Sequence, residues 1–394
     1  MKIAIVGPPR DLHLQRWGKA LETAGAQIVY VGVEPPPVEL SPYECIGPPT
    51  PHPTWITFWM RRHLLKTVLE KHNVTVAHPI HLTPSALWVW ASGFRPYIPF
   101  AMGADLFEYS PSPPPLKRSW TLQSRNPSLW GGATVHLRRL LYPALLQKIL
   151  RDSLLAVGDN YEICFMKKFF EKEKKYIELP TGIVFPSEES FLPAGSRRLL
   201  LAPRGATLLY QADIILEAFQ KYLQAGGAFF SLSLLAGPYP IHPTIKAKAA
   251  HLKKHYPDLF FFLEKKISYI EMKSLWKQAA AFISAPVYDG YSYAVAEGRL
   301  YGALPIVNSI PAHREILTHG YNAWFVEPFS SDKLAETLFS LESLFQNNTA
   351  PFWEERNRRW IHRFSDLQTN ATLFLQHTEA ALHHNKLYLH RQTK

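Results

Sequence analysis

The first 33 residues constrain the fold of this chain more than any other stretch. The run "KIAIVG" is short and apolar, which predicts a buried strand that ends at Gly7. The next segment has Leu14, Trp17 and Leu21 at helical spacing and Gly25 as its stop, and "QIVYVGV" follows as a second strand. A strand, a helix and a strand in succession form a βαβ unit with parallel strands. Gly7 therefore follows a strand end where parallel sheets bind ligands.

The same alternation of strands and helices continues to the C-terminal third. Further strands are predicted at "VTVAHPIH", "YIPFAMGADLF", "SLLAVGD", "YIELPTGIVF", "LLLAPRG", "FSLSLLAGPY", "LFFFLEKKIS", "AAFISAPVYDG", "LPIVNS" and "NAWFVEP". Helices are predicted over 54–73, 135–149, 211–227, 269–279, 293–302 and 330–345, with two more between 352 and 394. A Pro-rich hinge near 185–195 and a Pro/Ser-rich loop over 108–132 interrupt this order.

A chain of 394 residues suits two domains rather than one. We predict an α/β protein with two doubly wound, Rossmann-like domains that face a central cleft. Their predicted bounds are residues 1–188 and 189–360, and the helices of 361–394 are expected to pack back towards the N-terminal domain.

Composition limits the partners and the compartment. The net charge of +11 favours an anionic partner: nucleotide phosphates, nucleic acid or an anionic lipid surface. No nucleic-acid recognition motif accompanies this charge, so nucleic acid is not expected as a partner. The two cysteines, Cys45 and Cys164, form no disulfide framework and indicate a reducing compartment. With no signal peptide and no apolar run long enough to span a membrane, we expect a cytoplasmic protein.

Two acids bracket a predicted helix start in "VYDGYSYAVAEGRL". Asp289 precedes the helix, Gly290 permits a sharp turn, and Ser292 is a good N-cap. The amides from Gly290 to Tyr293, Tyr291 included, are predicted to bind an anion there. Glu297 lies further along the same helix, so a pyrophosphate at the helix start would lie between the two carboxylates. The alternative is an ordinary capped helix with two exposed acids.

The order of these motifs resembles the retaining glycosyltransferases of the GT-B fold in glycosyltransferase family 4 (group 1). The family's Glu-x7-Glu motif matches Asp289 to Glu297, with Asp for the first Glu, and "GALPIV" and "REILTHGYNAWFVEP" resemble the segments that follow it. The resemblance implies transfer of a sugar from a UDP- or GDP-sugar to an acceptor hydroxyl, without a cofactor or metal. No Asp-x-Asp and no His/Cys ligand set is present in the sequence.

The resemblance also implies a set of site residues. Its catalytic residues are Asp289, Glu297, Arg204 and His81. The donor-binding residues it implies are Gly290, Tyr291, Ser292, Tyr293, Gly237, Ile267, Gly7 and Tyr210, where the position of the family's phosphate-binding lysine falls at Tyr210 and Gln211. On the acceptor side are Gly103, Asp105 and His78.

The acceptor is expected to be a glycan or a lipid-linked saccharide near a membrane. A predicted helix carries aromatic and cationic residues together, namely Trp55, Phe58, Trp59, Arg61, Arg62 and Lys66, and the loop over 108–132 adds more of both kinds. Such a helix favours peripheral binding to an anionic surface, at the inner face of the plasma membrane. An ordinary surface helix that packs its tryptophans inward is an equally good interpretation.

Two other functions remain open from the sequence. Asp289 for Glu, the missing lysine near 210 and Val184 for Asp depart from the family pattern. These departures are compatible with a non-catalytic partner protein that keeps the fold and binds a nucleotide sugar or another transferase. A GT-B epimerase is a third interpretation, which the overall order of the motifs disfavours.

Overall fold

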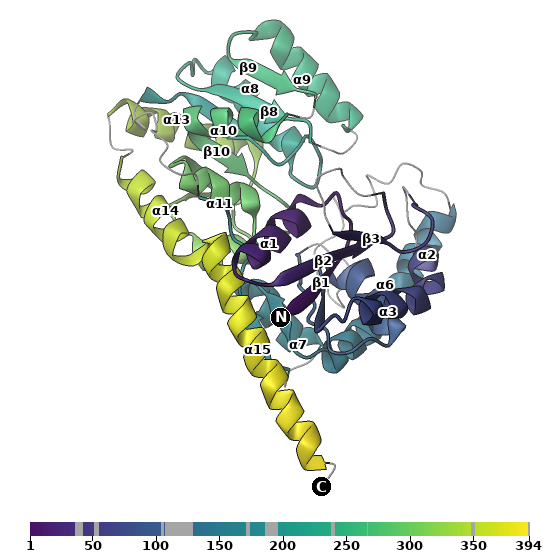
Figure 1. The fold of residues 1–394 in the computed structure, drawn as a ribbon. Coiled ribbons are helices and arrows are strands. Elements are labelled where there is room, and N and C mark those ends of the chain that lie inside the picture. The colour runs from purple at the N-terminus through teal and green to yellow at the C-terminus, as the bar shows by residue number, and fades with distance from the viewer. Residues whose placement is uncertain are drawn as a thin grey trace. The chain divides into compact units, whose positions relative to one another are not determined.

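Figure 1 shows the computed structural model of the chain, which describes residues 1–35, 42–50, 55–103, 106, 129–170, 174–185, 196–237, 241–265, 267–347 and 351–392. The chain forms two compact units. Unit 1 contains the described residues up to 106, Trp130–Val184 and the chain from Asp366, and unit 2 contains Phe185–Ser365. The boundaries predicted from the sequence were after residues 188 and 360. The structure divides the chain after Val184 and Ser365 instead.

Unit 1 is built on parallel strands. Its elements are β1 (Lys2–Val6), α1 (Leu12–Thr23), β2 (Gln27–Gly32), β3 (Tyr43–Cys45), α2 (Trp55–Met60), α3 (Arg62–Lys71), β4 (Val76–Pro79), the short turn η1 (Leu82–Ala86), α4 (Leu87–Ser92), α6 (Leu129–Asp152), β5 (Ala156–Gly158), α7 (Asn160–Phe169), β6 (Tyr176–Glu178) and α15 (Leu367–Gln392). The sheet order is β3-β2-β1-β4, and bridges through Tyr97 and Phe100 lead on towards the pair β5-β6. From β1 the chain adds β2 and β3 on one side, and β4 then pairs with the other side of β1. The strand order therefore reverses between β1 and β4.

The core of unit 1 joins the two ends of the chain. Ile3 and Ile5 of β1 are fully buried with Trp17 of α1 and with residues of α15. The ring of Trp17 meets Phe374 of α15 edge to face, with 5.7 Å between the ring centroids. The predicted return of the C-terminus to the N-terminal domain is therefore made by α15, the yellow helix of Figure 1.

Unit 2 holds one six-stranded parallel sheet. Its elements are β7 (Leu199–Ala202), α8 (Ala212–Gln224), β8 (Ser231–Leu235), α9 (Pro243–His255), β9 (Phe260–Leu263), α10 (Tyr269–Gln278), β10 (Ala279–Ser284), α11 (Tyr293–Leu300), β11 (Leu304–Asn308), α12 (Pro311–Ile316), β12 (Trp324–Val326), α13 (Ser331–Gln346) and α14 (Pro351–Phe364). The order β12-β11-β10-β7-β8-β9 is the Rossmann order, and it reverses between β7 and β10.

Helices cover both faces of the unit 2 sheet. Ala281 and Ile283 of β10 belong to a core shared with α8, α9 and α13. Phe282, between them in sequence, packs on the other face against Trp276 of α10. Helix α11 is held on that face by Arg299, whose Nε donates to Asn357 of α14 over 2.8 Å.

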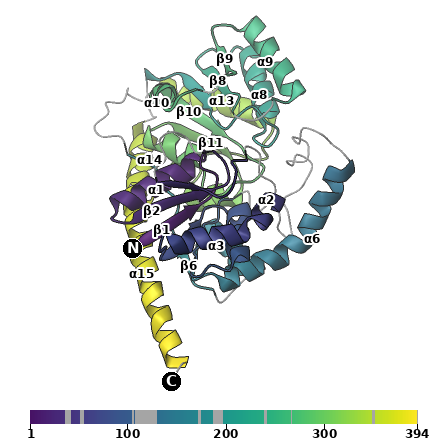
Figure 2. The same ribbon diagram turned by 45° about the vertical axis from the view of Figure 1, so that its right-hand side comes forward.

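The structure differs from the predicted elements in several places. The helix expected over 54–73 divides at Arg61 into α2 and α3, which follow one another in Figure 2. Helix α6 starts at Leu129, inside the segment predicted as a loop. The described residues 97–103 form isolated bridges rather than a continuous strand. The sequence prediction missed α7 and α9, and the hinge over 186–195 lies outside the described residues. No helix in the described part of the chain has both the length and the apolarity needed to cross a membrane.

Candidate functional site

The reversal of strand order in unit 2 brings Arg204 and Asp289 together. Arg204 follows β7 and Asp289 follows β10, and these two strands are neighbours in the sheet. Arg204 Nη2 donates to Asp289 Oδ2 over 2.8 Å, and both side chains are about four-fifths buried. The other carboxylate oxygen, Oδ1, accepts the backbone N–H of Gly290 over 3.1 Å. Two of the three catalytic residues predicted for this unit, Arg204 and Asp289, therefore form one ion pair at the carboxyl edge of the sheet.

Tyr210 lies where the resemblance places a lysine. Its ring packs against the guanidinium of Arg204, 4.6 Å from the ring centroid, and its hydroxyl accepts from Nη2 over 3.3 Å. Burial raises the pKa of the Tyr210 phenol, so the hydroxyl is neutral at pH 7. Gln211, next to it, donates from Nε2 to the carbonyl of Ala285. This corner of the sheet thus has an aromatic ring and a neutral hydroxyl in place of a second cation.

Two glycines allow the loops after β7 and β8 to meet. Gly205 has φ +91° and Gly237 has φ +74°, a region that disfavours side chains. A Cβ on Gly237 would lie 3.0 Å from the Cα of Gly205, and Ala206 donates to the carbonyl of Ala236 beside them. Gly237 therefore supports the loop that carries Arg204. The sequence prediction singled out Gly237 and missed Gly205, although "PRG" after a buried strand is a turn signal.

Helix α11 starts where the sequence predicted. Ser292 occupies the N-cap position, but its hydroxyl accepts no hydrogen bond from the helix. Ser292 Oγ is buried without a hydrogen-bond partner among the described residues. Tyr291 and Tyr293 meet edge to face at 5.6 Å, and Glu297 is half-buried within the helix. The amide of Gly290 and the Ser292 hydroxyl therefore frame the start of α11 beside the Arg204–Asp289 pair. Ile267, also predicted to bind the donor, is half-buried on the loop between β9 and α10.

Unit 1 contains a second pair at its own reversal of strand order. His81 follows β4, and its Nε2 lies 2.7 Å from Oδ2 of Asp11, which follows β1. Asp11 Oδ1 accepts the backbone N–H of His13 and so caps α1. Burial raises the pKa of Asp11, but the hydrogen bond and the charge of His81 outweigh it, and the pKa is lowered overall. His81 has φ +74°, a strained value for a side chain other than glycine.

Asp11 was not among the predicted site residues. The signal was an aspartate directly before the helical pattern that begins at Leu12, which is typical of an N-cap. Gly7, by contrast, was predicted to bind the donor. In the structure a Cβ on Gly7 would lie 2.7 Å from Leu14 Cδ1, so a larger residue there would have to displace the Leu14 side chain of α1.

The prediction that His78 lines the acceptor side is wrong. Its side chain is fully buried in unit 1. Nε2 accepts from Trp17 Nε1 over 2.9 Å, and Nδ1 donates to the carbonyl of Ile98 over 2.6 Å. Burial lowers the pKa of His78 to about 4, which keeps the ring neutral. Strand alternation decides between His78 and His81, and the sequence pattern left that choice open because Pro79 lies between them.

Of the other two predicted acceptor residues, the structure describes Gly103. The backbone N–H of Gly103 donates to the carboxylate of Glu162, a buried side chain of α7. Glu162 also accepts from the amide of Asp159 in a capping box. Asp105 lies outside the described residues. In the described part of the chain, no group of three or more His, Cys, Asp or Glu side chains could hold a metal ion.

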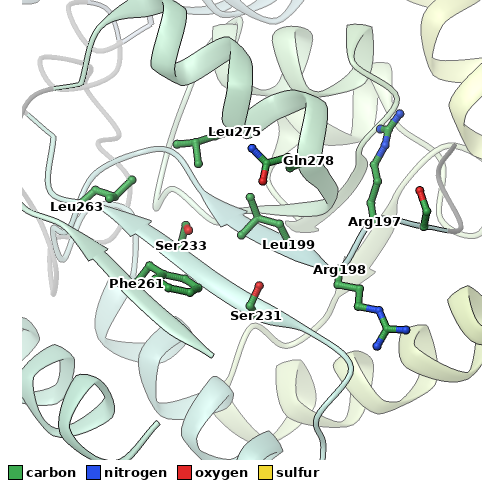
Figure 3. A pocket seen from close by; sticks show the side chains of 10 residues that line it. Arg197, Arg198, Leu199, Ser231, Ser233, Phe261, Leu263, Leu275 and Gln278 are labelled. Atoms are coloured by element: carbon green, nitrogen blue, oxygen red, sulfur yellow. The ribbon is translucent and has the colours of Figure 1, made fainter. Parts of the chain in front are cut away.

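A separate groove of about 490 Å³ lies on one face of the unit 2 sheet (Figure 3). Ser231 and Ser233 of β8 and Phe261 of β9 form its floor, and Leu275 of α10 borders it. The groove reaches Ser196–Leu199, where β7 begins, so it extends to the amino ends of the strands. Arg197 also lines the groove. Its guanidinium donates to the carbonyl of Tyr301 over 2.8 Å and is therefore already hydrogen-bonded within the core. The sequence predicted nothing at this groove.

Comparison with known proteins gives the fold. No known family matches the sequence, and no curated protein matches it. Among solved structures, sucrose-phosphate synthase from Thermosynechococcus elongatus superposes with a TM-score of 0.74 at 13% identity, over 96% of this chain and 98% of its own.

Two further structures agree. HepE from Anabaena, in complex with UDP-glucose, has a TM-score of 0.67 at 12% identity, over 96% of this chain and 100% of its own. The trehalose 6-phosphate synthase from Burkholderia multivorans has a TM-score of 0.66 at 12% identity, over 100% of this chain and 98% of its own. The predicted α/β architecture with two Rossmann-like domains is confirmed, and the fold is GT-B.

Proposed function

We propose that this protein is a retaining glycosyltransferase of family 4, which moves a sugar from a nucleotide-diphosphate sugar to an acceptor hydroxyl. The observation that carries the proposal is the Arg204–Asp289 pair beside the start of α11, at the reversal of strand order of unit 2. Ligands of open parallel sheets bind at this position. HepE, which shares the fold, was solved with UDP-glucose, and the sucrose-phosphate and trehalose 6-phosphate synthases share it as well.

The proposed chemistry is electrostatic. The bond between the anomeric carbon and the diphosphate oxygen breaks, and the nucleotide diphosphate leaves with the electron pair. The acceptor oxygen bonds to that carbon from the same face, and its proton passes to a phosphate oxygen. Charge grows on the leaving group during this step, so Arg204 and the amides at the start of α11 stabilise the transition state more than the substrate.

The acids have complementary roles in this proposal. Asp289 accepts hydrogen bonds from hydroxyls of the transferred sugar, and Glu297 binds the ribose, because each carboxylate accepts from two hydroxyls. Asp289 also forms an ion pair with Arg204. We propose that no divalent cation takes part, since Arg204 and the helix start supply the positive potential at the diphosphate.

We further propose that the acceptor is lipid-linked or close to an anionic membrane, at the cytoplasmic face. Helices α2 and α3 expose an apolar patch: Ile56 is 49% exposed, Trp59 47%, Met60 73% and Leu64 52%. Arg62 lies 4.6 Å over the ring of Trp59. Such a mixture of apolar and cationic side chains suits the interface between lipid head groups and acyl chains.

Not every residue of the predicted membrane cluster belongs to this surface. Phe58 packs inward, edge to face with Trp88 at 5.2 Å, and Arg61 donates to the carbonyl of Ile46 over 2.8 Å and to Thr50. The side chains of Trp55 and of residues 108–132 lie outside the described part of the chain. Arg62 and Lys66 are therefore the better positions for charge reversal than Arg61.

Sedimentation with anionic vesicles tests the membrane proposal. Each Lys or Arg close to such a surface adds about 1 kcal/mol, so Arg62→Glu with Lys66→Glu is expected to weaken binding strongly, and high salt to weaken it in the wild type. Lys253→Glu with Lys254→Glu on α9 changes the net charge by the same amount and is the control. Equal recovery of wild type with neutral and anionic vesicles at low salt would favour a soluble acceptor.

A binding screen and product analysis test the enzyme. UDP, GDP and their sugars are added to the purified protein, and a ligand at 100 times its Kd raises the free energy of unfolding by about 2.7 kcal/mol. NMR of the anomeric proton then shows whether the donor's configuration is kept. Binding without donor hydrolysis or transfer to any acceptor would support the non-catalytic interpretation instead. Absence of binding by every nucleotide sugar would contradict both.

A further inference from the structure

Two polar side chains that this mechanism does not use lie at the end of β11, the strand that neighbours β10, which Asp289 follows. Asn308 is the last residue of β11, which pairs with β10, and His313 lies on α12 directly after it. Their side chains are nearly inaccessible, with 7% of Asn308 and 1% of His313 exposed. The sequence motifs singled out neither residue.

Each of the two side chains makes one hydrogen bond, and that bond shows which of its other atoms remains as an acceptor. Asn308 Nδ2 donates to the carbonyl of Pro286 over 2.6 Å, so its Oδ1 remains as an acceptor. His313 Nδ1 lies 2.9 Å from the carbonyl of Asn308. A carbonyl only accepts, so Nδ1 carries the proton, and Nε2 of the neutral ring is an acceptor too. Neither Oδ1 nor Nε2 has a hydrogen-bond partner among the described residues.

The buried environment of His313 keeps its ring neutral. Burial lowers the pKa of His313 most, and the charge of Asp289 raises it while that of Arg204 lowers it. The geometric link to the site is the chain of bonds from His313 to the carbonyl of Asn308 and from the Asn308 side chain to the carbonyl of Pro286, three residues before Asp289. Buried acceptors in native proteins almost always have a partner, either from the protein, from water or from a ligand.

We propose that Asn308 and His313 are specificity-determining residues of the donor site, whose Oδ1 and Nε2 accept hydrogen bonds from substrate hydroxyls. The inference rests on the proposed function. An ionised phosphate has no proton to donate, so two bare acceptors do not suit the diphosphate. The hydroxyls belong to the transferred sugar or to the ribose, and the two sources give different results in binding experiments.

Two substitutions at His313 separate the two ring nitrogens. In His313→Asn the amide nitrogen can still donate to the Asn308 carbonyl, as Nδ1 does, but nothing replaces Nε2. In His313→Gln the longer side chain reaches the position of Nε2 and can still accept. Thermal unfolding of both variants shows that they fold.

Calorimetric titration with UDP, UDP-glucose, GDP and GDP-mannose is the test. We expect His313→Asn to bind the nucleotide sugar about tenfold more weakly, the loss of one hydrogen bond, and His313→Gln to lie closer to wild type. If the hydroxyl belongs to the sugar, the affinity for the nucleoside diphosphate alone is unchanged. If it belongs to the ribose, both affinities fall together. Wild-type affinity of His313→Asn for every ligand overturns the inference and indicates a structural water at Nε2.

A second measurement does not depend on the stability of a variant. In the ¹⁵N spectrum of the wild type, the Nε2 signal assigned to His313 by its loss in His313→Gln is expected to shift when the nucleotide sugar saturates the protein. An unmoved signal in a protein that binds the nucleotide sugar overturns the inference, whereas a wild type that binds none of the four ligands overturns the proposed function and the inference with it.

Discussion

The two units place an acid and a base at the same topological position, with the order of their charges exchanged. In unit 1 the acid, Asp11, follows the first strand and the base, His81, follows the fourth, at 2.7 Å. In unit 2 the cation, Arg204, follows the first strand and the acid, Asp289, follows the fourth, at 2.8 Å. Both pairs lie where the strand order of their sheet reverses.

The two pairs differ in whether the charge of the basic partner depends on pH. Arg204 keeps its charge at any pH that the protein survives, so this cation does not change with pH. His81 can gain or lose a proton, and Asp11 orients its ring. Asp11 also caps α1 through its other oxygen, whereas Asp289 uses its other oxygen on the adjacent amide of Gly290. Asp11 therefore joins His81 to the start of α1, whereas Asp289 joins Arg204 to the loop before α11.

The largest expected effect is that of Arg204→Ala. Its hydrogen bonds to the leaving diphosphate strengthen as charge develops, so we expect kcat to fall by about 10²–10³. Steady-state kinetics measure the loss, with Arg198→Ala, which removes an exposed arginine stacked on Phe229, as the control. A rise in KM at constant kcat would show that Arg204 binds substrate and transition state alike.

Asp11→Asn tests whether the Asp11–His81 pair of unit 1 contributes to catalysis as well as to the cap of α1. Asparagine is also a good N-cap, so α1 is expected to remain capped while the carboxylate that orients His81 is lost. We expect kcat to fall by about tenfold or more, with a smaller loss in Asp11→Asn than in His81→Ala. If kcat in Asp11→Asn equals that of wild type, the pair of unit 1 is structural.

The same substitution tests how the stability of the folded protein depends on pH. The pKa of Asp11 is lower in the folded protein than its usual value of 3.8, so the carboxylate contributes stability that is fully present above that value. This contribution is lost as the pH falls through the folded pKa. Urea unfolding of wild type and Asp11→Asn should therefore differ at pH 6 and converge in strong acid. A difference that stays constant with pH would contradict this assignment.

Glu297→Ala is expected to have a smaller effect, on binding more than on the chemical step. The carboxylate is proposed to hold the ribose, which is bound in substrate and transition state alike, so we expect KM for the donor to rise by about tenfold. Glu336→Ala, which removes an exposed acid of α13 paired with Lys333, is the control. Unchanged KM and kcat would exclude Glu297 from the site.

No effect at all is expected from a chelator. If the charge of Arg204 and the start of α11 stabilise the leaving group, activity in EDTA should match activity without it. Rates with added Mg²⁺ or Mn²⁺ measure this directly. Loss of activity in EDTA and its recovery with either ion would show that unit 2 needs a metal where we propose that Arg204 is sufficient.

Much of the fold could be predicted from local sequence patterns. The buried strand runs, the glycine stops and the amphipathic helices predict two α/β units, because strands buried on both faces of a parallel sheet are continuous apolar runs. Asp289, Ser292 and Glu297 were found because they lie within one short segment around a helix start. Helices α7 and α9 were missed, although the capping box of Asp159 and Glu162 and the N-terminal Pro243 of α9 are local signals.

The contacts that make the site were decided by the tertiary structure. Arg204 and Asp289 are 85 residues apart, and Asp11 and His81 are 70 apart, so no local pattern joins them. They meet because the order of strands brings the first strand of each sheet beside the fourth. His78 and His81 look alike in sequence, yet packing against Trp17 and Phe374 puts one in the core and leaves the other beside Asp11. The sequence determined which strands and helices form, and strand order and side-chain packing determined which residues meet, because these contacts depend on segments far apart in the chain.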